Sequence, residues 1–286
     1  MDAHRPQCSN RDVPSPDARG RFVSAVSARR ARLQSALKIA LFQRLRRRPG
    51  LFDLAKRLAR RLGHRHAEHD ILTAYARTQG AVHVLQVGAH DGLSNDPVRE
   101  FLVSRRDWRG TLVEPVPRLV AQLRQSYRDH PNVRIVQGAL ARTSGPTTLH
   151  TFTEHALSQL PYYADQLASL DRAHLQKHFP DRADLDALIE AVTVDAWSPS
   201  DFLARFALGR VDVLVIDVEG RDREVLEAFP FAQNHPDIVL FESAHFSSAD
   251  RGAIHALLTT HGYTLHIGDR DTIAVARTLD GPAMHG

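Results

Sequence analysis

Cysteine and long apolar runs are almost missing from this chain of 286 residues. The single cysteine, Cys8, rules out an internal disulfide and a zinc site built from several thiolates. No run approaches the ~18 to 20 apolar residues of a membrane span, and the longest N-terminal one, Ile39 to Phe42, is shorter than the ~7 to 15 residues of a signal-peptide core. These absences predict a cytoplasmic protein.

Lysine is scarce as well, since only three of the 37 basic residues are Lys. Basic residues are also unevenly placed: residues 1–66 hold 17 Lys and Arg against four acidic residues, a net +13, whereas the remainder holds 20 against 29, a net −9. With 43% hydrophobic and 24% charged residues, the chain as a whole has a globular composition, which excludes wholesale disorder and collagen. The two parts must therefore present different surfaces.

The first 66 residues predict a tail and two basic helices. Residues 1–20 lack apolar periodicity and predict a disordered tail, whereas residues 21–66 carry leucines at helical spacing on both sides of a Pro49-Gly50 break. Their arginine-rich faces could contact anionic lipid at the inner face of the membrane, bind nucleic acid, or stay in solvent while the leucines pack on the domain. The absence of an RNA-binding signature or a base-methylating motif disfavours nucleic acid.

Strands and helices alternate through residues 67–280. This alternation predicts a doubly wound α/β fold with a mostly parallel sheet. Four turn-forming residues, 268–271, separate the last two strands, which we expect to form an antiparallel hairpin. The predicted strands are Val82–Val87, Thr111–Val113, Val133–Val136, Val211–Ile216, Ile238–Phe241, Tyr263–Ile267 and Thr272–Ala276, and the predicted helices are Pro97–Ser104, Arg118–Arg128, Pro199–Ala207, Arg223–Phe229 and Ser248–His261.

Residues 145–195 interrupt this alternation. They predict strands near Thr147–Phe152 and Ala191–Val194 with a polar, aromatic stretch between them. We expect this insertion to cover the active-site edge of the sheet, where four of its side chains could shape an acceptor pocket, although packing is the simpler role for aromatic and histidine residues. The four are Tyr162, Tyr163, His174 and His178.

A glycine turn follows the first predicted strand. Gly88 and Gly92 allow a sharp turn and close approach of a ligand to the backbone, but their G-x-x-x-G spacing lacks the dinucleotide fingerprint. Glu114 ends the second strand, 22 residues after Gly92, where an acid can accept hydrogen bonds from both ribose hydroxyls. The pair indicates an adenosine-like ligand, and the alternative is an ordinary strand-to-helix turn with a surface glutamate.

Three segments carry a family resemblance: Leu85 to Gly92 with Asp96-Pro97, Trp108 to Pro115, and Val211 to Gly220 with Glu224 to Leu226. Together they resemble the FkbM-like branch of S-adenosylmethionine-dependent methyltransferases, in the subgroup with a Gly-Ala-Asn-Asp-Gly turn. The stretch Ser169 to Arg172 followed by Leu175 to His178 is similar to that subgroup too. The resemblance spans about residues 70–277 and implies a Rossmann-like class I fold with seven strands, one of them antiparallel.

The resemblance also implies where S-adenosylmethionine binds. Gly88, Ala89 and Gly92 would line the methionine and ribose part, Glu114 would hold the ribose hydroxyls, and Gly138-Ala139 would lie by the adenine. His90 and Asp91 of the same turn, and Gln86 before it, are also expected to bind the cofactor. The chain departs from the family at Gln86, where relatives carry Asp and which keeps a hydrogen bond to the ligand amine but loses a charge, and at His90, where Asn is usual.

Acidic residues end the fourth and fifth strands of the implied fold. Asp217 and Glu219 follow one strand, Glu242 and His245 the other, so three carboxylates and an imidazole could converge beside the methyl donor. Asp217 or His245 could be the general base, or Asp217 and Glu242 could hold a divalent cation such as Mg²⁺. Structural roles remain alternatives, with Glu219 capping a helix and His245 inert.

These features predict an S-adenosylmethionine-dependent methyltransferase that methylates a hydroxyl of a small molecule or sugar, an acceptor class taken from the family. The alternative is a non-catalytic scaffold of the same fold that binds a membrane or a partner through its basic helices.

Overall fold

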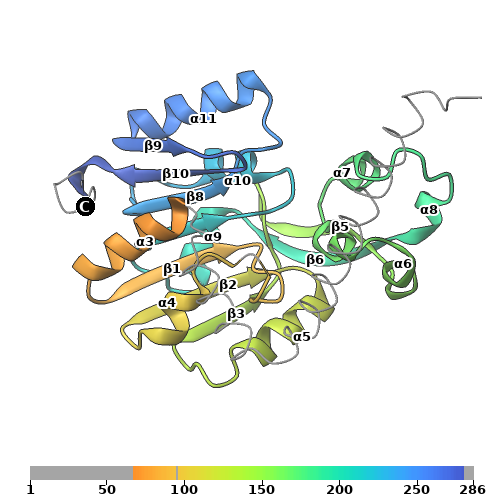
Figure 1. The fold of residues 1–286 in the computed structure, drawn as a ribbon, viewed down its shortest axis with the longest axis horizontal. Coiled ribbons are helices and arrows are strands. Elements are labelled where there is room, and N and C mark those ends of the chain that lie inside the picture. The colour runs from red at the N-terminus through yellow and green to blue at the C-terminus, as the bar shows by residue number, and fades with distance from the viewer. Residues whose placement is uncertain (1–66, 95, 280–286) are drawn as a thin grey trace, which may run out of the picture. The chain divides into compact units, whose positions relative to one another are not determined.

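A computed structural model describes residues 67–94 and 96–279, and the predicted tail and basic helices of residues 1–66 lie outside them. A seven-stranded sheet has the order β3-β2-β1-β7-β8-β10-β9 (Figure 1). Its strands are β1 (Val82–Val87), β2 (Trp108–Glu114), β3 (Val133–Gln137), β7 (Val213–Ile216), β8 (Ile238–Glu242), β9 (Tyr263–Ile267) and β10 (Asp271–Ala276). Strand β10 runs antiparallel to both of its neighbours, which confirms the predicted hairpin and the mostly parallel seven-stranded sheet with one antiparallel strand.

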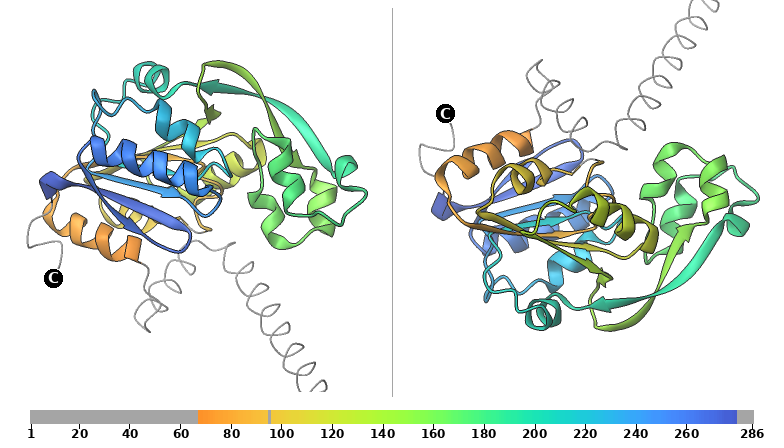
Figure 2. Two further views of the ribbon diagram at one scale, coloured as in Figure 1. Left: turned by 90° about the horizontal axis from the view of Figure 1, so that it is seen from above. Right: turned by 90° about the horizontal axis from the view of Figure 1, so that it is seen from below.

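The sheet is covered on both faces because its strands alternate between two buried layers. In β1, Val82 and Val84 pack in one layer, and Leu85 and Val87 pack in the other. The first layer contains α3 (Ala67–Thr78), α4 (Arg99–Ser104) and α5 (Pro117–Ser126), and the second contains α9 (Pro199–Arg205), α10 (Asp222–Ala228) and α11 (Ser248–Thr260). Figure 2 shows α3 and α11 on opposite sides of the sheet.

Helix α3 is an element that the sequence reading did not predict. It begins at Ala67, the first residue that the structure describes, and its buried side chains are Leu72, Tyr75 and Ala76. Its sequence has an even mix of polar and apolar residues. The Tyr75 hydroxyl donates to Asp237 (2.7 Å), which fixes the helix to the segment before β8.

The predicted insertion forms a second, three-stranded sheet with helices at its far end. Strands β5 (Gly145–Phe152) and β6 (Ile189–Trp197) pair antiparallel along their whole length, and β4 (Ala139–Leu140) pairs with β6. Both predicted strands are present: the first is longer at its start, where β5 begins at Gly145, and the second is longer at both ends. Between them lie α6 (Glu154–Gln159), the 3-10 helix η1 (Tyr162–Gln166), α7 (Arg172–Lys177) and α8 (Leu185–Leu188). A 3-10 turn, η2 (Arg277–Leu279), ends the described chain.

The insertion has its own apolar core, built around Phe152, Leu175 and Ile189. A smaller cluster that includes Leu119 and Leu149 joins it to α5. All views place these helices beyond the carboxyl ends of the parallel strands (Figures 1 and 2). The insertion therefore closes one side of the sheet edge at which ligands bind in this architecture.

Candidate active site

A cavity of about 830 Å³ lies at the carboxyl ends of β1, β2, β7 and β8. These ends are level, because Val87 pairs with both Val113 and Ile216, and Ile216 pairs with Phe241. The residue after each end therefore reaches the same space. The predicted site residues that line the cavity are Gln86, Gly88, Ala89, His90, Glu114, Gly138, Ala139, Asp217, Glu219 and Glu242.

Gly88 turns the chain sharply after β1. Its φ of 81° lies in the left-handed region, and a Cβ at this position would collide with the Asp217 carbonyl oxygen. The amides of Gly88 and Ala89 both donate to the Val113 carbonyl (2.9 and 3.0 Å). The turn thus brings the ends of β1, β2 and β7 together without a side chain between them.

Glu114 is buried at the end of β2, with 4% of its surface exposed. One carboxylate oxygen accepts the His90 amide and the other accepts the Val116 amide, both at 2.9 Å. Burial raises the pKa of Glu114, and the nearby His90, the two amides and Arg118 only partly oppose this. Each oxygen keeps a further lone pair, so the carboxylate can accept two hydroxyl donors in addition to its backbone bonds.

Gln86 and His90 also line the cavity. The Gln86 side chain is 3% exposed, and its buried Oε1 has no hydrogen-bond partner among the described residues. The His90 Nδ1 lies 3.1 Å from Asp91 Oδ1. Burial lowers the pKa of His90, but the hydrogen bond and charge of Asp91, with the charges of Asp165 and Glu114, more than reverse this and raise it overall.

Asp91 and Gly92 do not line the cavity. Asp91 Oδ1 accepts hydrogen bonds from the backbone amides of Leu93 (3.0 Å) and Ser94 (2.8 Å), which stabilises the turn. Gly92 faces the side chains of Leu123 and Tyr127. A contact of either residue with a cofactor stays a prediction.

Asp217 follows β7 and points into the cavity. Its side chain is exposed to the cavity space, although protein atoms enclose it on nearly every side. This enclosure, followed by the charges of Glu219, Glu242 and Asp271, raises the pKa of Asp217 to about 8. With a pKa of about 8, the carboxyl group is mostly protonated at pH 7, and its ionised form gains as the pH rises.

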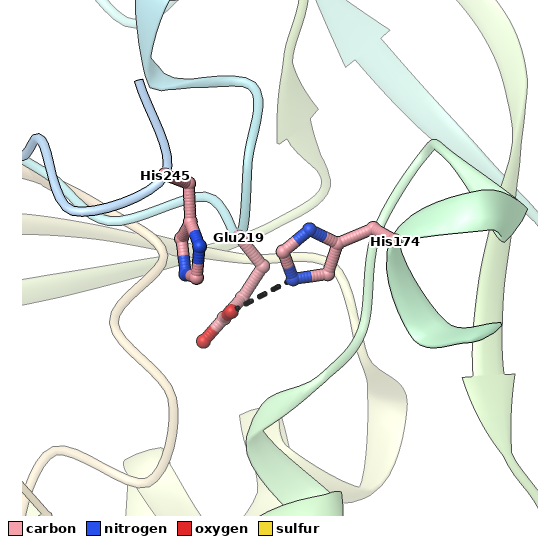
Figure 3. Close-up of side chains that lie close together, drawn as sticks. All are labelled: His174, Glu219 and His245. Atoms are coloured by element: carbon pink, nitrogen blue, oxygen red, sulfur yellow. Dashed lines mark hydrogen bonds and ion pairs between the residues drawn. The ribbon is translucent and has the colours of Figure 1, made fainter. Parts of the chain in front are cut away.

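Glu219 comes from a strained turn. Glu219 and Gly220 both have left-handed φ angles, 50° and 89°, and the Ser169 hydroxyl donates to the Glu219 carbonyl (3.0 Å). A Cβ at Gly220 would lie 2.6 Å from His174 Nδ1, so glycine is what allows the histidine of α7 to approach. The His174 Nε2 lies 3.2 Å from Glu219 Oε2 (Figure 3).

Glu242 and His245 lie on the other side of Glu219. Glu242 is 5% exposed, and its two oxygens face Arg270 Nη2 (2.7 Å) and His245 Nε2 (3.4 Å). The exposed His245 does not line the cavity but meets the ring of His174 edge-on, with ring centroids 5.3 Å apart. Glu219 does not act as a helix cap, because α10 begins at Asp222 and has no side-chain cap.

The chain matches the sequence family described as Methyltransferase FkbM domain over residues 86–265. It belongs to the FkbM methyltransferase family. The match covers more than half of the chain and includes all of the predicted site residues that line the cavity. The reaction to be placed in this site is therefore methyl transfer from S-adenosylmethionine.

Solved methyltransferase structures are similar only at low level. The O-methyltransferase of Bacillus cereus in complex with SAH gives a TM-score of 0.42 at 10% identity, covering 82% of this chain and 97% of that one. Fibrillarin of Aeropyrum pernix with bound S-adenosyl-L-methionine gives a TM-score of 0.37 at 13% identity, covering 69% of this chain and 67% of that one. Precorrin-6y C5,15-methyltransferase of Geobacter metallireducens gives a TM-score of 0.35 at 12% identity, covering 72% of this chain and 86% of that one. These scores carry no argument about substrate. No curated protein matches the chain significantly.

The cavity of this FkbM methyltransferase fits S-adenosylmethionine. The buried, unpartnered Gln86 Oε1 offers an acceptor for a ligand amine, Glu114 offers two oxygens for ribose hydroxyls, and Gly88 leaves room beside the backbone. Gly138 and Ala139 line the neighbouring wall. Within residues 67–94 and 96–279, no helix is long and apolar enough to cross a membrane.

The insertion contributes residues that sequence reasoning missed. Gln166, Ser169 and Leu170 line the cavity, and so do Arg270 and Asp271 of the β9–β10 turn. Nothing in these segments of the sequence predicted that they would line the cavity. Of the expected acceptor-pocket residues, Tyr163, His174 and His178 do not line the cavity. Tyr163 stacks on Phe179, His174 contacts Glu219, and His178 contacts the ring of His174. The side chain of Tyr162 lies outside the described part.

Proposed function

We propose that this FkbM methyltransferase methylates a hydroxyl oxygen of a small molecule or sugar. The observation that carries the proposal is the composition of one cavity. Its lining includes Gln86, Gly88 and Glu114, which form the cofactor wall, and next to them the carboxylates Asp217 and Glu219. A hydroxyl is the acceptor that most needs a proton acceptor at the site of transfer, because its pKa is far above neutral.

The residues of the cofactor wall bind and orient. When bound, S-adenosylmethionine supplies a sulfonium methyl group, which the acceptor oxygen takes in line while the electron pair of the broken carbon–sulfur bond stays on sulfur. Glu114 accepts the ribose hydroxyls and keeps its two backbone amides, so the turn after β1 is already ordered before binding. Gln86 Oε1 accepts a hydrogen bond from the ligand amine.

Asp217 is the proposed general base. It is the cavity-lining carboxylate directly after β7, and its amide donates to the Val87 carbonyl (2.9 Å), which holds it beside the Gly88 turn. The hydroxyl proton passes to the Asp217 carboxylate as the oxygen attacks. His245 is the less direct candidate for this role, because it does not line the cavity.

A divalent cation such as Mg²⁺ between Asp217 and Glu242 is the second way to activate the acceptor. The structure offers less support for this pair than for the base, because both Glu242 oxygens already face partners, Arg270 and His245. Magnesium would need these oxygens in a nearly ideal octahedron.

Calorimetry with S-adenosylhomocysteine tests the cofactor site, and release of S-adenosylhomocysteine with hydroxyl-bearing and amine-bearing acceptors tests the reaction. We expect binding, and turnover only with hydroxyl acceptors. Turnover confined to amines would refute O-methylation. An absence of binding would favour the non-catalytic scaffold.

Contact with an anionic membrane through residues 21–66 is proposed from their net charge alone. The full chain should bind anionic vesicles at low salt, gaining about 1 kcal/mol per well-placed basic residue, and should be released as ionic strength rises. A chain lacking residues 1–66 should not bind. Equal binding by both chains would remove the membrane role and the peripheral location with it.

A further inference from the structure

Two imidazoles and a carboxylate converge beside the acceptor end of the cavity. One ligand-capable atom each from His174, Glu219 and His245 lies within 4.8 Å of the others (Figure 3). The three residues come from separate elements: α7 of the insertion, the turn after β7 and the loop after β8. Their convergence is a product of the tertiary fold, since 71 positions separate the first from the last.

The distances suit a shared ion. Two ligand atoms that are each about 2.1 Å from one ion lie about 3.0 to 3.4 Å apart at tetrahedral to octahedral angles. His174 Nε2 and Glu219 Oε2 already lie 3.2 Å apart. His245 is the exposed member and sits on a loop, so its ring can close the remaining gap by a change of rotamer.

Contacts with neighbouring residues fix the positions of His174 and Glu219. The side chain of His174 is buried, and Gly220 leaves the space that its ring occupies. Glu219 is held by the left-handed turn and by the Ser169 hydroxyl on its carbonyl. Glu242 lies 3.4 Å from His245 Nε2 and can orient that ring as a carboxylate does for a metal-bound histidine.

The donor set selects the ion. Magnesium and calcium prefer oxygen ligands only, whereas two imidazole nitrogens with one carboxylate suit zinc, iron, cobalt, nickel or manganese. A bound dication would also sit among several acidic groups, since Glu242 and Asp217 are close to Glu219. The alternative is a hydrogen-bonded His174–Glu219 pair that needs no ion.

We propose that His174, Glu219 and His245 form a binding site for a divalent transition-metal ion. The site differs from the Asp217–Glu242 pair in residues and in preferred metal. Because Glu219 also lines the cavity, an open position on the ion would face the acceptor. There it would hold the acceptor oxygen and lower the pKa of its hydroxyl, with the proton passing to Asp217. This catalytic role rests on the proposed function, whereas ion binding does not.

Cobalt binding to the full chain tests the site. The protein, freed of any histidine tag and of metal by a chelator, is titrated with Co²⁺ while its visible ligand-field absorption is recorded, and Zn²⁺ is then added to displace the cobalt. The chain has 17 histidines, so the informative quantity is the difference between variants rather than the total. His155→Ala is the matched control, because His155 is an exposed histidine of the same insertion whose ring contacts Gln159 rather than the cluster.

We expect wild type and His155→Ala to bind one Co²⁺ more tightly than His174→Ala or His245→Ala, by about 100-fold or more. His245 is exposed, so His245→Ala keeps the test valid even if His174→Ala fails to fold. Zn²⁺ should raise the Tm of wild type but not of these two variants. Identical Co²⁺ titrations for all four proteins would overturn the site and leave the hydrogen-bonded pair.

Calorimetry with S-adenosylhomocysteine on the same proteins separates this proposal from the proposed function. We expect unchanged affinity in His245→Ala, because His245 lies outside the cavity lining. Cofactor binding without cobalt binding would refute the metal site alone. Cobalt binding without cofactor binding would refute the methyltransferase role and keep the metal site.

Discussion

Glu114→Gln is the substitution that tests the cofactor wall most sharply. The amide has nearly the same shape as the carboxylate but replaces one of its two acceptor oxygens by an NH₂ group. Both oxygens already accept a backbone amide at 2.9 Å, from His90 and Val116. Whichever way the Gln side chain is turned, its NH₂ group therefore faces the backbone N–H of either His90 or Val116, and one ribose hydroxyl loses its acceptor.

The magnitude follows from these contacts. A hydrogen bond to a charged group contributes about 1.5 to 3 kcal/mol, so loss of one should weaken binding by about 10-fold to 150-fold. The unsatisfied amide costs about 1 to 3 kcal/mol of folding stability. Removing a buried charge offsets part of that cost, since burial is what raises the pKa of Glu114. We therefore expect a larger loss in cofactor affinity than in stability.

Calorimetry with S-adenosylhomocysteine measures the affinity, and thermal unfolding without ligand measures the stability. Glu190→Gln is the matched control, because Glu190 is an exposed glutamate on β6. The control should bind like wild type. A Kd of Glu114→Gln equal to that of wild type, with both proteins folded, would refute the assignment of the ribose hydroxyls to Glu114.

Four further predictions follow from the same geometry. Gly88→Ala should lose cofactor binding and stability together, since its Cβ would collide with the Asp217 carbonyl at a left-handed φ, and wild-type affinity would contradict this. Asp217→Asn should keep cofactor binding but lose turnover by about 100-fold or more, because the amide cannot accept a proton. Retained turnover would end its role as base. Gly220→Ala should push His174 away from Glu219 and weaken Co²⁺ binding while cofactor affinity stays unchanged, and an unaltered cobalt titration would show that the turn is not needed. Affinity for S-adenosylhomocysteine should fall as the pH falls through the raised pKa of Glu114. The reason is that the ribose hydroxyls bind the ionised carboxylate and so lower the pKa of Glu114 in the complex. Glu114→Gln should lack this part of the pH dependence.

The sheet could be predicted from the sequence because its signals are local. β-branched runs separated by helical periodicity mark each strand, and the turn-forming residues 268–271 mark the hairpin. Glu114 could be placed by its distance from the glycine turn. Helix α3 was missed although half of its residues are apolar, and its docking depends on the long-range hydrogen bond from Tyr75 to Asp237.

The histidine cluster could not be predicted as a cluster. His174 could be named as a candidate for the acceptor side, but nothing in the sequence pairs it with Glu219, 45 positions away. Their contact depends on the β5–β6 arm, on the place of α7 at its far end and on the left-handed φ at Gly220. Backbone angles of this kind are permitted by glycine but not required by it.

The cofactor-binding residues and His174 of the proposed metal site are supported by different cores, and this separates the two sites. Gln86 and Glu114 extend from strands buried in the two layers of the main sheet, whereas His174 is carried by α7, whose Leu175 packs in the core of the insertion. Glu219 bridges them, since it follows β7 but contacts α7. Changes within the insertion core can therefore move the acceptor side and any bound ion, while Gln86 and Glu114 keep their positions. The insertion is accordingly the part of the chain in which acceptor specificity can vary without loss of the methyl donor.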